Sequence, residues 1–323
     1  MTERPAPDVC VIMPAWRSAD FITTAIASVQ AQENVSWELI IVDDASPDNT
    51  GTVVQGLAND DPRIKYERLS KNSGPAAARN RAIALSTAPF IAVLDDDDTM
   101  HPRRLRTMLD LAEANNADIV IDNMLEVEDT LARPEIGPFL SLPIDSALRS
   151  ISLEDYLDPR AEARFGASLG YLKPLFRRSS LWARYNETLR NSEDFYLVAE
   201  LLAHGASMLL SPEPLYSYTR RRGSLSWRLS AAHAEAIVNA HKRFNHRHGQ
   251  KLSSAERRAS NRLLRQRQDM YVFAVIVEAL KARRVSTLVT TLFGQPASLP
   301  FVTSEIVRIA REKLVARFRL QAS

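Results

Sequence analysis

Short apolar runs alternate with segments of helical periodicity along the first part of the chain. These runs predict five strands, over residues 9–14, 37–44, 64–69, 90–95 and 117–123. A segment with helix-like spacing follows each of the first four strands. This order is typical of a Rossmann-like, doubly wound α/β fold, whose mostly parallel sheet binds ligands beyond the carboxyl ends of its strands.

The pattern changes after about residue 125. Residues 126–165 are rich in loops, and the sequence SLED predicts the start of a short helix. A strand, a helix and a second strand are then expected over residues 171–176, 191–205 and 211–220. From Ala231 onward the pattern is helical almost throughout. We therefore expect an α/β domain over residues 1–228, with halves 1–125 and 126–228, and a helical C-terminal extension over residues 229–323.

Composition indicates a soluble protein of the cytoplasm. Cys10 is the only cysteine, which excludes an internal disulfide and fits a reducing compartment. The N-terminal stretch lacks the apolar run of a secretory signal. The apolar run at residues 272–280 ends at the basic sequence KARR, so it is too short to span a bilayer.

The net charge of +2 hides a strong asymmetry. Residues 1–219 carry 20 Lys and Arg against 33 Asp and Glu, and residues 220–323 carry 21 against 6. The basic tail raises nucleic-acid binding as an alternative function, but the acidic front half argues against it as the main one. In the tail, His241, His246 and His248 lie among lysines and arginines that disfavour a metal ion, so we interpret them as an exposed helix face.

Acidic residues gather at the predicted strand ends. Asp43 and Asp44 end the second strand, and Asp95, Asp96, Asp97 and Asp98 end the fourth. Because adjacent carboxylates repel one another, a compensating charge is expected nearby. Mg²⁺ or Mn²⁺, held by one or two carboxylates and by substrate phosphates, would supply that charge. The alternative is a solvated acidic turn.

The segment between these two acidic sites is suited to an anion. Gly74 and Pro75 break the chain just before an Ala-rich helix, and Arg79 lies near the start of that helix. Free N–H groups and the helix dipole favour negative charge there, so a diphosphate could meet a helix terminus, an arginine and a metal together. An ordinary surface helix is the alternative.

A basic loop over residues 218–228 is the counterpart of the acidic run. Arg221 and Arg222 stand close to the hydroxyl of Ser224. Such a set can grip a diphosphate or close over it, although a solvated basic loop is an equal alternative for any one arginine.

Two further carboxylates can serve as a base. Glu193 and Asp194 follow Asn191 and Ser192, which are good N-cap types, so both carboxylates are expected in the first turn of a helix. Acidic residues are common there because of the helix dipole alone. A positioned carboxylate can also take the proton from an attacking hydroxyl group.

The ordered set VIMPAW, IIVDDAS, NSGPAAARN, LDDDD and NSEDFYL resembles the family 2 glycosyltransferases of GT-A fold. The resemblance covers about residues 8–228. The overall pattern is also similar to bacterial enzymes that extend lipid-linked exopolysaccharide repeats, including succinoglycan-type glucosyltransferases. The resemblance to these enzymes implies a UDP-linked sugar donor.

The resemblance implies roles for particular residues. Pro14 and Ala15 would line the base pocket, and Asp43 or Asp44 would accept a hydrogen bond from the uracil imide. Asp95 and Asp97 match the D-x-D pattern, in which the last carboxylate usually binds the metal. Asp194 would be the base, with Glu193 beside it. The remaining donor contacts would come from Asn72, Gly74, Arg79, Asp96, Arg221, Arg222 and Ser224.

We therefore expect a metal-dependent, inverting glycosyltransferase that moves a sugar to a saccharide or lipid-linked acceptor in the synthesis of a bacterial exopolysaccharide or cell-surface glycan. The expected donor is UDP-glucose. The alternatives are a nucleotidyltransferase, which would release pyrophosphate, and a non-catalytic nucleotide-sugar sensor. The sensor predicts that Asp194→Ala leaves function intact.

The last segment, residues 304–321, predicts a basic amphipathic helix. Such a helix can lie on the anionic inner face of the plasma membrane, which would bring the enzyme to a lipid-linked acceptor. Alternatively, its apolar side packs on the protein or on a second subunit in a homodimer.

Overall fold

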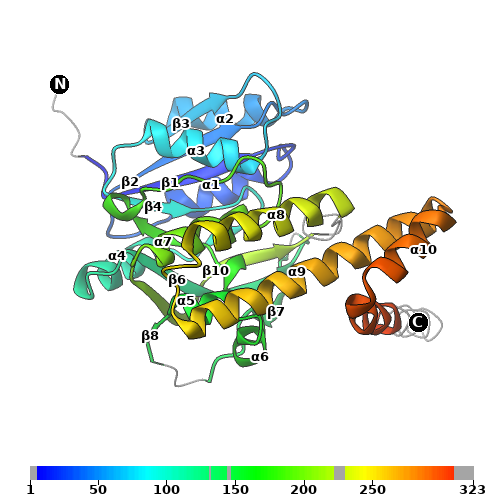
Figure 1. Cartoon of the computed structure of the whole chain (residues 1–323). Coiled ribbons are helices and arrows are strands. Elements are labelled where there is room, and N and C mark those ends of the chain that lie inside the picture. The colour runs from blue at the N-terminus through cyan, green and yellow to red at the C-terminus, as the bar shows by residue number, and fades with distance from the viewer. Residues whose placement is uncertain (1–5, 131, 144–146, 222–229, 309–323) are drawn as a thin grey trace. The chain divides into compact units, whose positions relative to one another are not determined.

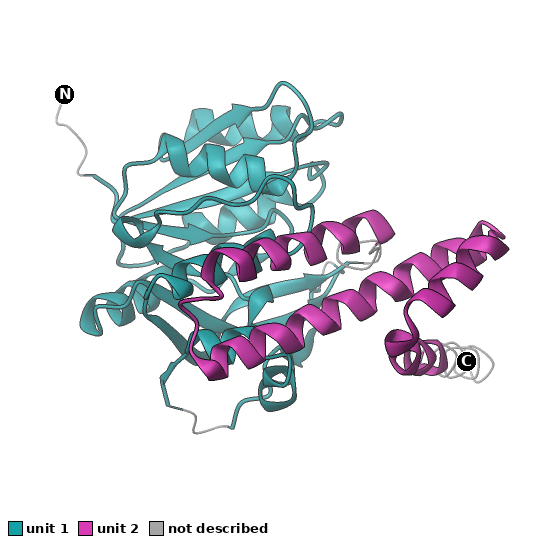
Figure 2. Cartoon of the chain, in the orientation of Figure 1, with its two compact units in different colours: residues 1–224 teal, residues 225–323 magenta. Residues whose placement is uncertain are grey.

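The computed structural model describes residues 6–308, except residues 131, 144–146 and 222–229. The chain forms two compact units, Met1–Ser224 and Leu225–Ser323 (Figure 2). The boundary predicted at residue 228 lies outside the described residues.

The first unit is built on one large sheet (Figure 1). Four parallel strands form one side of it, in the order β3–β2–β1–β4. Every residue of β1, β2 and β4 is buried, as expected for strands covered on both faces. The predicted doubly wound, mostly parallel sheet is confirmed. The strands are β1 (Val9–Ala15), β2 (Trp37–Asp43), β3 (Ile64–Arg68) and β4 (Phe90–Val93).

The other side of the sheet is mixed. β9 (Leu175–Arg177) runs antiparallel between β4 and β6 (Ile119–Glu128), and β6 pairs in parallel with β10 (Met208–Arg220). Three short strands were not predicted, because two to four residues are too few to show a period. They are β5 (Thr99–Met100), β7 (Glu135–Pro138) and β8 (Arg149–Ser150).

Helices connect the parallel strands as predicted. The connecting helices are α1 (Ile22–Gln30), α2 (Thr50–Asp60), α3 (Pro75–Leu85) and α4 (Arg104–Ala114). Ser152 forms the predicted cap, accepting from the N–H of Asp155. The later helices of the unit are α5 (Leu153–Leu157), α6 (Ala161–Phe165), α7 (Glu193–Ala203) and the 3₁₀ turns Leu169–Tyr171 and Arg178–Ser180.

The second unit is helical over its described residues. It contains α8 (Ala231–His248), α9 (Ser254–Lys281), α10 (Val285–Gly294) and a 3₁₀ turn at Pro296–Ser298. Val272, Ile276 and Val302 form a small buried core, against which Leu288 and Leu292 pack. No helix in the described part of the chain is long and apolar enough to cross a membrane.

The exposed-face interpretation of the histidines is wrong for His241 and His248, which are both buried. The Nε2 atom of His241 lies 2.9 Å from the carbonyl oxygen of Ser260 in α9. Burial lowers the pKa of His241 to about 4, so its ring is neutral. The pattern along α8 did not reveal that α9 packs against the side of α8 that carries His241.

Candidate active site

The carboxyl ends of β2, β1 and β4 meet at one edge of the sheet. Pro14 and Ala15 end β1 and are buried, with Ala15 paired to Asp43. The next residue, Trp16, is 43% exposed, and its backbone N–H donates to Asp96. The strand ends therefore bring the predicted base-pocket positions and the acidic run together.

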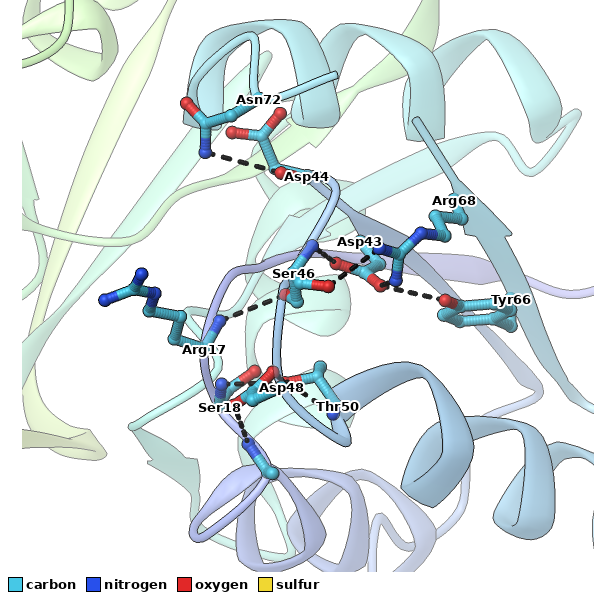
Figure 3. Close-up of polar contacts among 11 residues, drawn as sticks. Arg17, Ser18, Asp43, Asp44, Ser46, Asp48, Thr50, Tyr66, Arg68 and Asn72 are labelled. Carbon is cyan, nitrogen blue, oxygen red and sulfur yellow. Dashed lines mark hydrogen bonds and ion pairs between the residues drawn. The ribbon is translucent and has the colours of Figure 1, made fainter. Parts of the chain in front are cut away.

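Asp43 is fully buried, and its carboxylate is hydrogen-bonded to neighbouring residues (Figure 3). It accepts hydrogen bonds from the Tyr66 hydroxyl at 2.9 Å, from Arg68 at 2.9 Å and from the Ser46 N–H at 2.8 Å. These contacts hold the turn that leads from β2 towards α2. Buried polar atoms require such partners, so Asp43 stabilises the loop at this strand end.

Asp44 holds the loop that precedes α3. Its carboxylate accepts hydrogen bonds from the backbone N–H groups of Ser73 at 2.6 Å and Gly74 at 2.8 Å. Asn72 donates to the carbonyl oxygen of Asp44 (Figure 3). Gly74 has a φ of 94°, which favours glycine. A Cβ there would lie 2.5 Å from Arg190 Nη1, so a side chain at this position would also need Arg190 to move.

Arg79 lies at the centre of a buried charged cluster. Its Nη1 donates to Glu193 Oε1 at 2.7 Å and its Nη2 to Asp95 Oδ1 at 2.7 Å. Nη1 is also 3.5 Å from Asp194 Oδ1. The side chain is only 4% exposed. The structure thus joins the helix after β3, the end of β4 and the start of α7 through one guanidinium group.

Lys173 is the second cation of this cluster, and the sequence analysis missed it. Its Nζ lies 2.7 Å from Asp95 Oδ2 and 3.8 Å from Asp194 Oδ2. Although burial acts to raise the pKa of Asp95, the charges of Lys173 and Arg79 lower it below its usual range. The available signal was a lysine inside an otherwise apolar run, residues 171–176.

The acidic run divides into carboxylates with different surroundings. Asp98 is buried and accepts from the Tyr216 hydroxyl at 2.7 Å and the Thr219 N–H at 2.8 Å. Asp95 has the compensating charge that was expected. Among the described residues, no lysine or arginine forms an ion pair with Asp96 or Asp97.

The electrostatics of Asp96 and Asp97 fit a cation site. Burial and the neighbouring Asp97 charge raise the pKa of Asp96 to about 8. Burial and the Asp95 charge raise the pKa of Asp97 to about 6, and the charge of Arg221 acts in the opposite direction. A divalent cation would relieve this repulsion.

The structure describes only residues 218–221 of the predicted basic loop. Arg221 pairs with Asp129 at 3.0 Å and places its guanidinium over the ring of Phe21. Arg222 and Ser224 lie outside the described residues.

The start of α7 differs from the predicted cap. Ser192 has a φ of 65° and its hydroxyl makes no capping hydrogen bond; it contacts Asn191 instead. Glu193 and Asp194 do lie in the first turn of α7. Asp194 Oδ1 is buried without a hydrogen-bond partner within the described ranges. The Asp194 side chain as a whole is 16% exposed, so its carboxylate can accept a proton from a substrate hydroxyl.

Comparison with known proteins agrees with this geometry. The sequence profile of glycosyl transferase family 2 matches residues 10–153. The chain is similar to the succinoglycan biosynthesis protein ExoO of Rhizobium meliloti, with 35% identity over 97% of this chain and 88% of that protein. The chain therefore belongs to glycosyl transferase family 2, and the resemblance that its motifs indicated is confirmed.

Two further similarities are relevant. A GalNAc(5)-diNAcBac-PP-undecaprenol beta-1,3-glucosyltransferase of Campylobacter jejuni is 32% identical over 59% of this chain and 56% of its own length. The crystal structure of an S. aureus TarS fragment in complex with UDP-GlcNAc has a TM-score of 0.63 and 17% identity, covering 88% of this chain and 79% of that one. The likeness to TarS and the strand order together confirm the GT-A fold class.

Proposed function

We propose that this glycosyltransferase transfers a sugar from a UDP-sugar to a saccharide or lipid-linked acceptor. The transfer would serve bacterial exopolysaccharide or cell-surface glycan synthesis, and the sugar that we propose is glucose. The observation that carries the proposal is the Asp194 carboxylate, which lies between Arg79 and Lys173 beside Asp95 and whose Oδ1 accepts no hydrogen bond within the described residues. The names of ExoO and of the C. jejuni glucosyltransferase support the class of product. The TarS complex supports a UDP-sugar as donor.

The reaction is a single displacement with inversion. The Asp194 carboxylate takes the proton of the acceptor hydroxyl while the hydroxyl oxygen attacks the anomeric carbon of the donor. The bond from that carbon to the diphosphate oxygen breaks, and UDP leaves with the electron pair. Lys173 and Arg79 hold the Asp194 carboxylate in place, because each lies within 4 Å of one of its oxygens.

The residues present fit a divalent metal ion, Mn²⁺ or Mg²⁺. Asp97 would hold it, with Asp95 and Asp96 adjacent, since burial and the neighbouring carboxylates raise the pKa values of Asp96 and Asp97 and a bound cation would favour their ionised forms. Asp95 shares its oxygens with Arg79 and Lys173. When bound, such an ion stabilises the negative charge of the departing diphosphate.

We also propose that the second unit binds the anionic inner face of the plasma membrane. Val285, Val289 and Phe293 recur every four residues of α10, so they share one side of it, and all three are exposed. Lys281, Arg283 and Arg284 precede α10, and residues 279–304 contain no acidic side chain. An apolar stripe next to basic residues fits anionic lipid headgroups. Only residues 304–308 of the predicted amphipathic segment 304–321 are described. The alternative to a membrane on the exposed side of α10 is a second copy of this chain.

The proposed reaction is tested by a screen of nucleotide-sugar donors that follows release of UDP in the presence of Mn²⁺. Release of UDP supports sugar transfer, whereas release of pyrophosphate would indicate a nucleotidyltransferase. Asp194→Asn should keep UDP affinity and lose turnover by about 10²- to 10⁴-fold, the usual contribution of a general base. Asp110→Asn, an exposed carboxylate in α4, is the matched control and should have normal turnover. Near-normal turnover of Asp194→Asn would overturn the assignment.

A further inference from the structure

Three aromatic side chains from distant segments meet beside the candidate active site. Phe139 follows β7, Tyr171 ends the 3₁₀ turn Leu169–Tyr171, and Tyr218 lies in β10. The ring centroid of Phe139 lies 5.9 Å from that of Tyr171 and 6.1 Å from that of Tyr218. We call these three residues the aromatic cluster.

Two residues of the cluster are close in the chain to residues that contact the acidic run and Asp194. Tyr218 precedes Thr219, whose N–H donates to Asp98 and whose hydroxyl donates to the carbonyl oxygen of Asp97 at 2.6 Å. Tyr171 lies two residues before Lys173, which contacts Asp95 and Asp194. The intervening residue is extended, so the Cα atoms of Tyr171 and Lys173 are about 6 Å apart.

The ring of Tyr171 is exposed although its backbone is fixed. Tyr171 as a whole is 47% exposed. The preceding Gly170 packs so closely on Phe195 that a Cβ there would lie 2.7 Å from the Phe195 ring. Phe195 follows Asp194 directly in α7. The turn that carries Tyr171 is therefore tied to the helix that carries the proposed base, and Tyr171 itself remains partly exposed.

The position of the cluster separates it from the predicted base pocket. Asp43 ends β2 and Asp44 follows it, whereas Tyr218 lies in β10, five strands further along the order β2–β1–β4–β9–β6–β10. The acidic run follows β4, between the two. A ligand on the cluster would approach the acidic run from the side away from the base pocket.

The chemistry of the cluster suits a sugar ring. The C–H face of a pyranose is apolar and carries slight positive charge, and it stacks on the electron-rich face of an aromatic ring. We propose that Tyr171, supported by Phe139 and Tyr218, is the stacking subsite for the acceptor saccharide. This inference rests on the proposed transfer reaction and adds to it the part of the site that binds the acceptor.

The test compares Tyr171→Ala with Tyr171→Phe. Methyl β-glucoside and methyl β-galactoside serve as probes of the UDP-loaded protein, and saturation-transfer NMR detects which sugar protons contact it. At least one probe should show transfer to C–H protons of one ring face in the parent protein and in Tyr171→Phe, and about tenfold weaker binding in Tyr171→Ala. UDP affinity and acceptor-free hydrolysis of the donor should change less than twofold.

Trp182→Ala is the matched control. Trp182 is 51% exposed, and its ring centroid lies 4.0 Å from that of His204, which caps the far end of α7 about 15 Å along the helix from Asp194. This variant should bind the probes as the parent does.

The possible results separate the subsite from the reaction. Equal probe binding by Tyr171→Ala and the parent, or no transfer from either probe to the parent, would overturn the stacking subsite even if UDP is released normally. Loss of UDP affinity in Tyr171→Ala would also overturn it, because the ring would then serve the donor. Absence of any donor turnover in the parent would instead contradict the proposed function.

Discussion

Replacing Lys173 with methionine tests whether the buried charged cluster stabilises the first unit. The substitution keeps a long, apolar stem and removes one positive charge. Lys173 is 9% exposed, and its Nζ lies 2.7 Å from Asp95 and 3.8 Å from Asp194. After the change, Arg79 alone would face the carboxylates of Asp95, Glu193 and Asp194.

The expected loss follows from these distances. With an effective dielectric constant of about 20, the two attractions amount to about 6 and about 4 kcal/mol. Methionine recovers the desolvation cost of the buried ammonium group, so the net effect is smaller. Removing one partner of a buried ion pair costs about 3 kcal/mol or more in free energy of unfolding. For a unit of this size, that lowers the melting temperature by about 6–12 °C.

Calorimetry at neutral pH measures this change, and Lys65→Met is the matched control. Lys65 lies 2.6 Å from Glu38 but is 55% exposed, so its loss should cost about 1 kcal/mol or less. Lys173→Arg should recover most of the stability because it restores the charge. Turnover of Lys173→Met should also fall, since Asp194 loses one of the two cations that position it.

The reasoning would be refuted if Lys173→Met and Lys65→Met lowered the melting temperature equally. It would also be refuted if Lys173→Met melted at the parent temperature, because the Lys173 contacts would then add nothing to the stability of the unit.

Three further outcomes are expected. Asp97→Ala should lower UDP affinity in Mn²⁺ to the metal-free value, as measured by calorimetric titration; equal affinity of the parent with and without Mn²⁺ would contradict the metal site. The protein should float with phosphatidylglycerol vesicles but not with neutral ones, Phe293→Glu should weaken flotation, and Ile136→Glu, at an exposed apolar position of the first unit, should not. Because the pKa of His241 is lowered to about 4 in the fold, the free energy of unfolding should decrease by about 3 kcal/mol as pH falls from 6.5 to 4, and His241→Gln should remove that part of the pH dependence in chemical denaturation.

The sequence alone determined the sheet and the edge at which the site lies. The apolar runs at residues 9–14 and 37–44 became β1 and β2 because a strand buried on both faces must be apolar along its length. Asp43 and Asp95 then had to lie at the same edge, since parallel strands end on the same side of a sheet. Five ordered motifs indicated the family.

Only the tertiary structure decided which side chains meet at that edge. Arg79 and Glu193 are 114 positions apart, and no spacing rule links them. The sequence placed Lys173 within a predicted strand and gave it no partner. In the folded chain, Lys173 contacts Asp95 and Asp194. The Phe139, Tyr171 and Tyr218 rings meet from three segments. A local pattern indicates which face of an element is apolar. The partner of a buried charge depends instead on contacts between elements that are distant in the chain, and the local pattern does not encode those contacts.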